Sequence, residues 1–136
     1  MFVMIMGCGR LGAQLATLLE QEGHEITILD MDKYAFDHLP TSFRGHKVLG
    51  DGTDQDTLRR AGAERAEAFV ATTRGDNRNA LASQVAKYVF HIPRVGSVIF
   101  DPIREEVYKG LGLSTINPTK LEASLLRDVI IAKTEE

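Results

Sequence analysis

The sequence lacks tryptophan, has a single cysteine, and contains no apolar run that approaches the ~20 residues of a membrane span. One cysteine, Cys8, excludes an internal disulfide and is typical of the cytosol, where thiols stay reduced. The first six residues are too few for a secretory signal peptide and carry no basic segment. These absences indicate a cytosolic protein without direct membrane insertion.

A surplus of basic residues is also missing. Lys and Arg together number 16, against 19 for Asp and Glu, and the formal net charge is −3. Nucleic acids attract basic proteins, so this charge balance indicates no nucleic-acid partner. Any phosphate must be bound locally, by backbone N–H groups and a few side chains. At 136 residues, of which 43% are hydrophobic, the chain is most simply one domain with a sizeable core.

The first thirty residues contain the most informative pattern. An apolar run, residues 2–6, leads into GCGRLG at residues 7–12, and a second β-type run, residues 26–29, stops at Asp30. Between them, leucines recur at helical spacing, namely Leu11, Leu15, Leu18 and Leu19. This is the G-x-G-x-x-G fingerprint between a strand and a helix, followed by an acid about 20 residues further on. It predicts a dinucleotide-binding turn.

Each part of this fingerprint has a physical role. Gly7 allows a tight turn, Gly9 has no Cβ and lets a phosphate approach the backbone, and Gly12 lets the helix pack closely on the strand. The free N–H groups and dipole at the helix start attract an anion. Asp30 can accept hydrogen bonds from the ribose hydroxyls and repels a 2′-phosphate. The pattern therefore favours NAD or an adenine nucleotide over NADP.

Strand-like and helix-like segments alternate along the rest of the chain. Further strands are expected at residues 46–49, 68–72, 95–99 and 115–116. Helices are expected at residues 33–39, 55–61, 77–90 (with Leu81, Val85 and Val89 on one face), 102–110 and 118–131. Asp32 and Asp54 are expected helix N-caps. This alternation predicts an α/β fold, a Rossmann-like doubly wound parallel sheet of six strands in the order 3-2-1-4-5-6.

Two loop sequences carry a family resemblance. GDGTD at residues 50–54 and GDNRN at residues 75–79, with the glycine turn and a later Asp-Pro at residues 101–102, together resemble the N-terminal nucleotide-binding domain of the RCK/KTN family. Members of that family are cytosolic regulators of bacterial potassium uptake systems of the Trk and Ktr types and of some potassium channels. The resemblance covers essentially the whole chain, as one domain over residues 1–136.

The resemblance implies a function. ATP, ADP, NAD or NADH would bind the crevice and change the shape of homodimers that assemble into a ring, and so gate a membrane potassium transporter or channel. It implies a cytoplasmic regulatory subunit, peripheral to the inner face of the membrane, that needs no catalytic residue. Because the acidic residues and histidines lack the spacing of metal ligands, no metal site is expected either. The nucleotide-binding residues predicted from the fingerprint and the resemblance are Gly7, Cys8, Gly9, Arg10, Leu11, Gly12, Asp30, Met31, Asp32, Lys33, Asp51, Gly52, Thr53, Thr72, Thr73 and Asp76.

Within that set the resemblance implies particular roles. Arg10 would reach the terminal phosphate of ATP, the loop at residues 51–53 would lie beside the adenine, and Thr72 and Thr73 would lie under the phosphates. Two features depart from the family. Val98 stands where many members have an arginine, and the usual smaller C-terminal ligand domain is missing. The chain is therefore expected to be either an excised domain or a lone domain whose partner chain supplies the rest.

Some residues keep two interpretations. Asp51 either bonds the adenine amino group or shapes its own turn. Asp76 and Asn77 either cap a helix or contact magnesium or phosphate. The apolar face of the last helix forms either core or a subunit interface; its residues are Leu121, Leu125, Leu126 and Val129.

Two other functions compete with gating. One is an NAD-dependent oxidoreductase, or its cofactor-binding half, because fold alone does not fix function. Against it, the sequence has no Tyr-x-x-x-Lys pair and no second domain to hold a substrate against a nicotinamide. The other is a structural subunit that has lost its ligand, which the intact fingerprint opposes.

Overall fold

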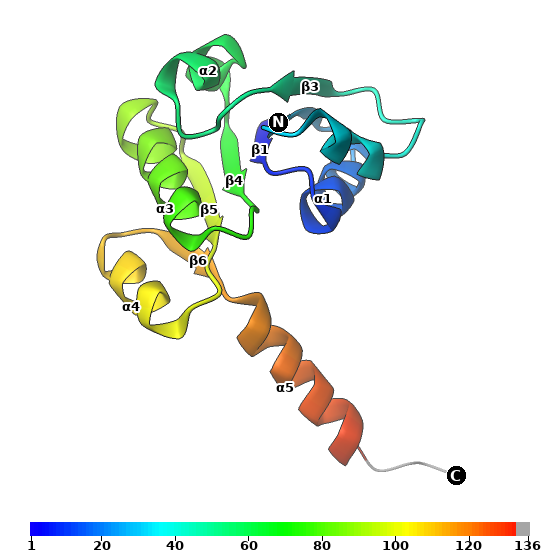
Figure 1. Cartoon of the computed structure of the whole chain (residues 1–136), viewed down its shortest axis with the longest axis vertical. Coiled ribbons are helices and arrows are strands. Elements are labelled where there is room, and N and C mark those ends of the chain that lie inside the picture. The colour runs from blue at the N-terminus through cyan, green and yellow to red at the C-terminus, as the bar shows by residue number, and fades with distance from the viewer. Residues whose placement is uncertain (133–136) are drawn as a thin grey trace.

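Six parallel strands form one sheet in the computed structural model, which describes residues 1–132 (Figure 1). The strands are β1 (Phe2–Met6), β2 (Glu25–Asp30), β3 (His46–Leu49), β4 (Ala68–Ala71), β5 (Arg94–Val98) and β6 (Ser114–Ile116). Their order is β3-β2-β1-β4-β5-β6, and every neighbouring pair is parallel. This confirms the predicted Rossmann-like sheet and puts its switch point between β1 and β4.

Helices connect successive strands. The α-helices are α1 (Arg10–Gln21), α2 (Gln55–Arg60), α3 (Asp76–Gln84), α4 (Pro102–Gly110) and α5 (Pro118–Ile131). Short 3₁₀ turns, η1 (Lys33–His38) and η2 (Ala63–Arg65), and a π-helical turn, η3 (Val85–Val89), complete the connections. The predicted N-caps are confirmed, because the carboxylates of Asp32 and Asp54 accept hydrogen bonds from backbone N–H groups at the starts of η1 and α2.

The central strand β1 is buried on both faces. Val3 and Ile5 pack with residues of α1 and η1, whereas Phe2, Met4 and Met6 pack with residues of α2 and α3. Side chains alternate along a strand, so a central parallel strand covered on both faces reads as an unbroken apolar run. The two helix layers leave the carboxyl ends of the strands as the edge where loops can form a site.

The predicted leucine face of α1 is only partly correct. Leu15 and Leu19 pack against the core, but Leu11 and Leu18 are 49% and 45% exposed. The buried residues of this helix are instead small ones, Gly12, Ala13 and Ala16. Small side chains let the helix lie close to the sheet, and the larger leucines then fall on its flanks.

The expected apolar face of residues 77–90 is only partly buried. Leu81 and Val89 are 49% and 44% exposed, and Val85 is only partly buried. The α-helix starts at Asp76, ends at Gln84 and gives way to the π-helical turn. Its buried residues are small or polar, namely Asp76, Asn79, Ala80, Ala82 and Ser83. Close packing between this helix and β4 and β5 selects small residues, which hydrophobicity does not predict.

The last helix, α5, projects away from the sheet (Figure 1). None of its residues is buried within the described chain, and Leu121 and Leu125 are more than half exposed. The core interpretation of its apolar face is therefore wrong for residues 1–132. No helix among these residues is long and apolar enough to cross a bilayer.

Candidate nucleotide-binding site

The glycine turn connects β1 to α1 at the switch point. Gly7 has a φ of +105°, in the left-handed region that disfavours other residues, and its N–H donates to the carbonyl of Leu29 at 2.8 Å. A Cβ on Gly12 would lie 1.8 Å from the carbonyl oxygen of Gly7, so only glycine fits there. A Cβ on Gly9 would meet nothing within 4 Å. The turn is therefore tightly packed at its two ends and open at its centre.

Asp30, at the end of β2, is bonded directly to this turn. One carboxylate oxygen accepts the N–H of Cys8 at 2.8 Å, and the other accepts the N–H of Asp32 at 2.8 Å. The acid predicted to bind ribose thus lies beside the glycine turn. A carboxylate has about four acceptor positions, so two bonds leave it able to accept from ribose hydroxyls.

The Cys8 side chain faces the core. It is fully buried, and burial, with the neighbouring charge of Asp30, raises the pKa of the thiol to about 11 although Lys47 lowers it. The thiol is therefore neutral at physiological pH and lies away from the surface. A nucleotide contact of Cys8 stays a prediction, and it would have to involve the backbone.

Arg10 is the first residue of α1 and is exposed. Its guanidinium has no hydrogen-bond or ion-pair partner within residues 1–132, and it lines a hollow of about 510 Å³ between α1 and the η1 turn, beside His38. A cation at a helix N-terminus is unfavourable for the helix dipole, which a bound phosphate would offset. The following residue, Leu11, is half exposed, so both predicted contacts face solvent beside the turn.

The residues after β2 also reach the surface. Met31 is 61% exposed, and Asp32 caps η1 by accepting the N–H of Tyr34 at 2.9 Å. Lys33 lies with its Nζ 5.2 Å from the ring centre of Tyr34. These positions are next to the crevice, and their contacts with a nucleotide stay predictions.

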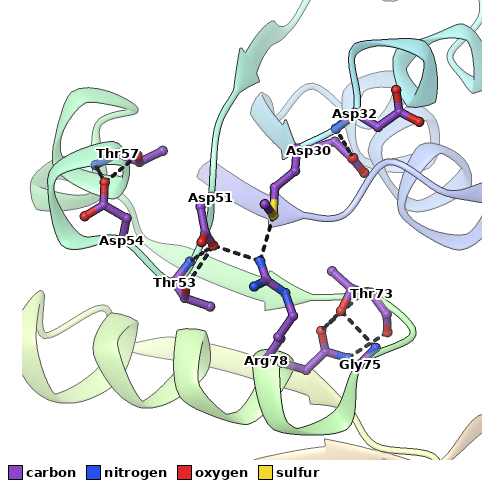
Figure 2. A network of polar contacts seen from close by, with 11 residues as sticks. Asp30, Asp32, Asp51, Thr53, Asp54, Thr57, Thr73, Gly75 and Arg78 are labelled. Atoms are coloured by element: carbon purple, nitrogen blue, oxygen red, sulfur yellow. Dashed lines mark hydrogen bonds and ion pairs between the residues drawn. The ribbon is translucent and has the colours of Figure 1, made fainter.

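Asp51, in the loop after β3, shapes its own turn (Figure 2). Its Oδ1 accepts the N–H of Thr53 at 2.9 Å and the hydroxyl of Thr53 at 2.7 Å. These bonds, with one from Arg78, hold the pKa of Asp51 below its ordinary value against the opposing effect of burial. Between the two residues, Gly52 packs on Met6, where a Cβ would lie 2.4 Å from the sulfur. The turn-shaping interpretation is confirmed, and the adenine contact stays a prediction.

Thr72 and Thr73, at the end of β4, bind other parts of the protein. The Thr72 hydroxyl lies 3.0 Å from the carbonyl oxygens of both Met6 and Gly7, which joins β4 to the glycine turn. The Thr73 hydroxyl donates to Oδ1 of Asn79 at 2.5 Å. Both threonines therefore fix the loop after β4 beside the glycine turn, and a direct phosphate contact from them stays a prediction.

Asp76 does not cap α3. It is the first residue of the helix and is 5% exposed, and its carboxylate accepts the backbone N–H groups of Phe100 at 2.7 Å and Asp101 at 3.0 Å. The capping expectation is therefore wrong, because the side chain connects α3 to the loop after β5. Asn77 instead accepts a hydrogen bond from the hydroxyl of Tyr108.

Two residues of the GDNRN loop have roles that the sequence did not predict. Asn79 is fully buried, and its amide donates to the carbonyl oxygens of Thr73 and of Val98, each at 2.8 Å. Arg78 forms an ion pair with Asp51 at 2.8 Å. The motif itself was the available signal, since both residues belong to it, but only the tertiary structure shows their partners.

The strand, glycine turn, helix and acid at a topological switch point define a Rossmann-like domain of the nucleotide-binding class. Residues 3–118 match the TrkA-N domain family, and the chain belongs to that family.

Curated relatives support the same family. The chain is 45% identical over 136 residues to the Trk system potassium uptake protein TrkA of Streptomyces coelicolor. This match covers 99% of the present chain and 61% of the relative. It is 32% identical over 131 residues to a TrkA homolog of Methanothermobacter thermautotrophicus, covering 96% and 60% of the two chains. The chain thus spans about three fifths of the length of these relatives.

Solved structures share the fold. The Kef CTD of Shewanella denitrificans, in an AMP-bound form, has a TM-score of 0.82 at 22% identity over 98% of this chain and 84% of that chain. GsuK bound to ADP has a TM-score of 0.82 at 22% identity, covering 98% and 34%. The GsuK channel bound to NAD has a TM-score of 0.80 at 22% identity, covering 94% and 23%. At these identities the likeness establishes the fold alone.

Proposed function

We propose that this chain is the nucleotide-sensing domain of a cytoplasmic regulatory subunit that gates a membrane potassium transporter or channel. An adenine nucleotide binds the crevice between β1 and β4. The observation that carries the proposal is the glycine turn, which is bonded to Asp30 and has open space at Gly9. The chain that contains this turn is related to Trk potassium uptake proteins.

The chemistry of the crevice indicates which kind of ligand it binds. The α1 N-terminus and the Arg10 guanidinium bind phosphate, and the free acceptor positions of Asp30 bind ribose hydroxyls. Similar folds are known with AMP, ADP and NAD, which supports the shared adenosine portion. We expect ATP, ADP, NAD or NADH to be the ligand.

Gating needs two conformations that bind the nucleotide with different affinity. We infer that α5 provides the contact with a second copy of the chain, since its apolar side chains have no cover within residues 1–132. Large apolar side chains exposed on this helix are Leu121, Leu125, Leu126, Val129, Ile130 and Ile131. Nucleotide-dependent movement of one copy against the other would then reach the membrane partner through a larger ring.

The proposed role is binding rather than catalysis. A sensor needs no general base or nucleophile, and the relatives are named as potassium uptake proteins. The oxidoreductase alternative shares the same fold and is separated by experiment. Calorimetric titration of the purified chain with ATP, ADP, NAD and NADH, with its oligomeric state measured before and after, is the first test. Binding with a change in assembly and no turnover supports the sensor, whereas hydride transfer from NADH supports the enzyme.

Asp30→Ala gives the sharpest variant. It removes the ribose acceptor, and we expect adenine-nucleotide affinity to fall on the order of 100-fold, because hydrogen bonds to charged groups contribute about 1.5–3 kcal/mol each. Asp37→Ala is the matched control, since Asp37 is an exposed acid in η1. Thermal unfolding of both variants separates lost affinity from lost structure. Unchanged binding in Asp30→Ala would overturn the ribose placement, and wild-type protein that binds no nucleotide would overturn the proposed function.

A further inference from the structure

One side chain crosses the proposed nucleotide crevice. Arg78 lies in the first turn of α3, after β4, but its guanidinium is bonded to Asp51 after β3 (Figure 2). In the sheet order, β3 and β4 are three positions apart, or about 14 Å at the usual ~4.8 Å strand spacing. The ends of β2 and β1, with Asp30 and the glycine turn, lie between them. Arg78 therefore spans the opening that the adenosine portion must enter.

The guanidinium is held at the Asp51 side of this opening. Its Nη2 lies 2.8 Å from Oδ1 of Asp51 and 3.1 Å from the sulfur of Met31. Asp51 is itself fixed by two hydrogen bonds from Thr53, so the cation has a preset position. That position is beside the carboxyl end of β3, which is the end of the crevice away from β4.

The Arg78 side chain is also partly open to solvent, so a ligand can reach it. The side chains of Arg78 and Asp51 are 44% and 37% exposed, and exposed ion pairs contribute little to stability because water screens them. A guanidinium is planar, delocalised and weakly hydrated, and it stacks readily on aromatic rings. Met31, 61% exposed beside it, adds a polarisable sulfur that also favours aromatic contacts.

We propose that Arg78 is an adenine-contacting residue, whose guanidinium packs on the face of the base while Asp51 and Met31 hold it at that end of the crevice. The inference rests on the proposed nucleotide function and adds to it a residue that contacts the base. Because the guanidinium is held beside Asp51 and Met31, it contributes to the affinity for the adenine. This contribution is independent of the number of phosphates on the nucleotide.

The test compares AMP and ADP binding by calorimetry in the wild type, Arg78→Met and Arg78→Lys. Arg78→Met keeps the unbranched side chain and removes the planar cation, and we expect both affinities to fall by the same factor, on the order of tenfold for a desolvated cation–π contact. Arg78→Lys keeps the charge without the plane, and we expect it to bind as weakly as Arg78→Met or nearly so. Arg59→Met is the matched control, because Arg59 is an ion-paired arginine of similar exposure, 49%, on α2.

Each of the other outcomes contradicts a specific part of the proposal. A larger loss for ADP than for AMP would place Arg78 on phosphate instead. Tighter binding in Arg78→Met would show that the ion pair obstructs the crevice, and unchanged binding, or full affinity in Arg78→Lys, would remove the stacking role. In all four cases the wild type still binds, which leaves the proposed function intact. Absence of AMP and ADP binding in the wild type would overturn both.

Discussion

The crevice edge of the sheet and the helix α5 are opposite kinds of structure. At the crevice, Asp30, Asp51 and Thr72 are all bonded to other parts of the chain, and Gly12 has no room for a single added carbon. Along α5, no residue is buried within residues 1–132. One region is complete within the described chain, and the other presents apolar surface to solvent.

This difference indicates where a partner is needed. The crevice can be prearranged for a small ligand, because its framework is fixed by short internal bonds. A helix with six large exposed apolar side chains gains stability only when a second surface covers them. We therefore expect changes at the packed ends of the turn to act on folding, and changes on α5 to act on assembly.

Gly12→Ala is expected to give the largest effect. The added Cβ would lie 1.8 Å from the carbonyl oxygen of Gly7 and 2.8 Å from the Thr72 hydroxyl, so the backbone must move. We expect the free energy of unfolding to fall by about 3 kcal/mol or more, at the upper end for overpacked sites. Chemical denaturation of the purified variant measures this change.

Gly9→Ala is the matched control for that variant. The same added carbon meets no atom within 4 Å, so stability should change by well under about 1 kcal/mol, while nucleotide affinity falls because the methyl group occupies the space for phosphate. Equal destabilisation by both substitutions would contradict the view that the turn is packed at its ends and open at its centre.

Leu125→Glu tests the other region. A charge in the middle of the apolar face should weaken self-association by about 30-fold, because loss of a central interface side chain costs about 2 kcal/mol of binding free energy. The unfolding of the monomer should change little. Sedimentation velocity over a concentration series measures it. Arg127→Gln changes the net charge by the same one unit at a residue that is 65% exposed, and it should leave association nearly unchanged. A wild-type chain that stays monomeric at all concentrations would contradict the inferred interface.

The smallest effect is expected where α5 joins the sheet. Glu105 of α4 is buried, and Lys120 of α5 donates to it at 3.1 Å. Burial raises the pKa of Glu105, but the hydrogen bond from Lys120 and the charges of Lys109 and Lys120 outweigh it and keep the pKa below its ordinary value. The carboxylate therefore stabilises the fold above the ordinary carboxyl pKa, and this contribution is lost as the pH falls through the lowered value.

Lys120→Met removes the nearer cation. We expect the free energy of unfolding to fall by about 1 kcal/mol at neutral pH. The difference from the wild type should shrink in acid, as the pH falls through the lowered pKa of Glu105 and its carboxylate is protonated. Urea unfolding at several pH values measures both. Lys109→Met, whose ammonium lies 3.8 Å from Glu105, should have a smaller effect. A difference that persists unchanged at low pH would show that the lysine acts by packing alone.

Much of the fold follows from local sequence. The apolar run of β1, the Asp32 and Asp54 caps and the alternation of strand and helix gave the correct strand order, because right-handed crossovers leave few arrangements for such a chain. The helix faces were less predictable. In α1 and α3, close approach to the sheet selects alanine, glycine and serine over leucine, and that distance is a property of the packed structure.

For the site, the sequence by itself determined the glycine turn and the acid after β2, since both obey rules of local backbone geometry and fixed spacing. Only the tertiary structure decided that Asp76 bonds the loop after β5, that Asn79 is buried against Val98, and that Arg78 reaches Asp51 across the sheet. These contacts join residues that are distant in the chain. Their partners are set by which strand ends lie together, and that information exists only once the sheet has formed.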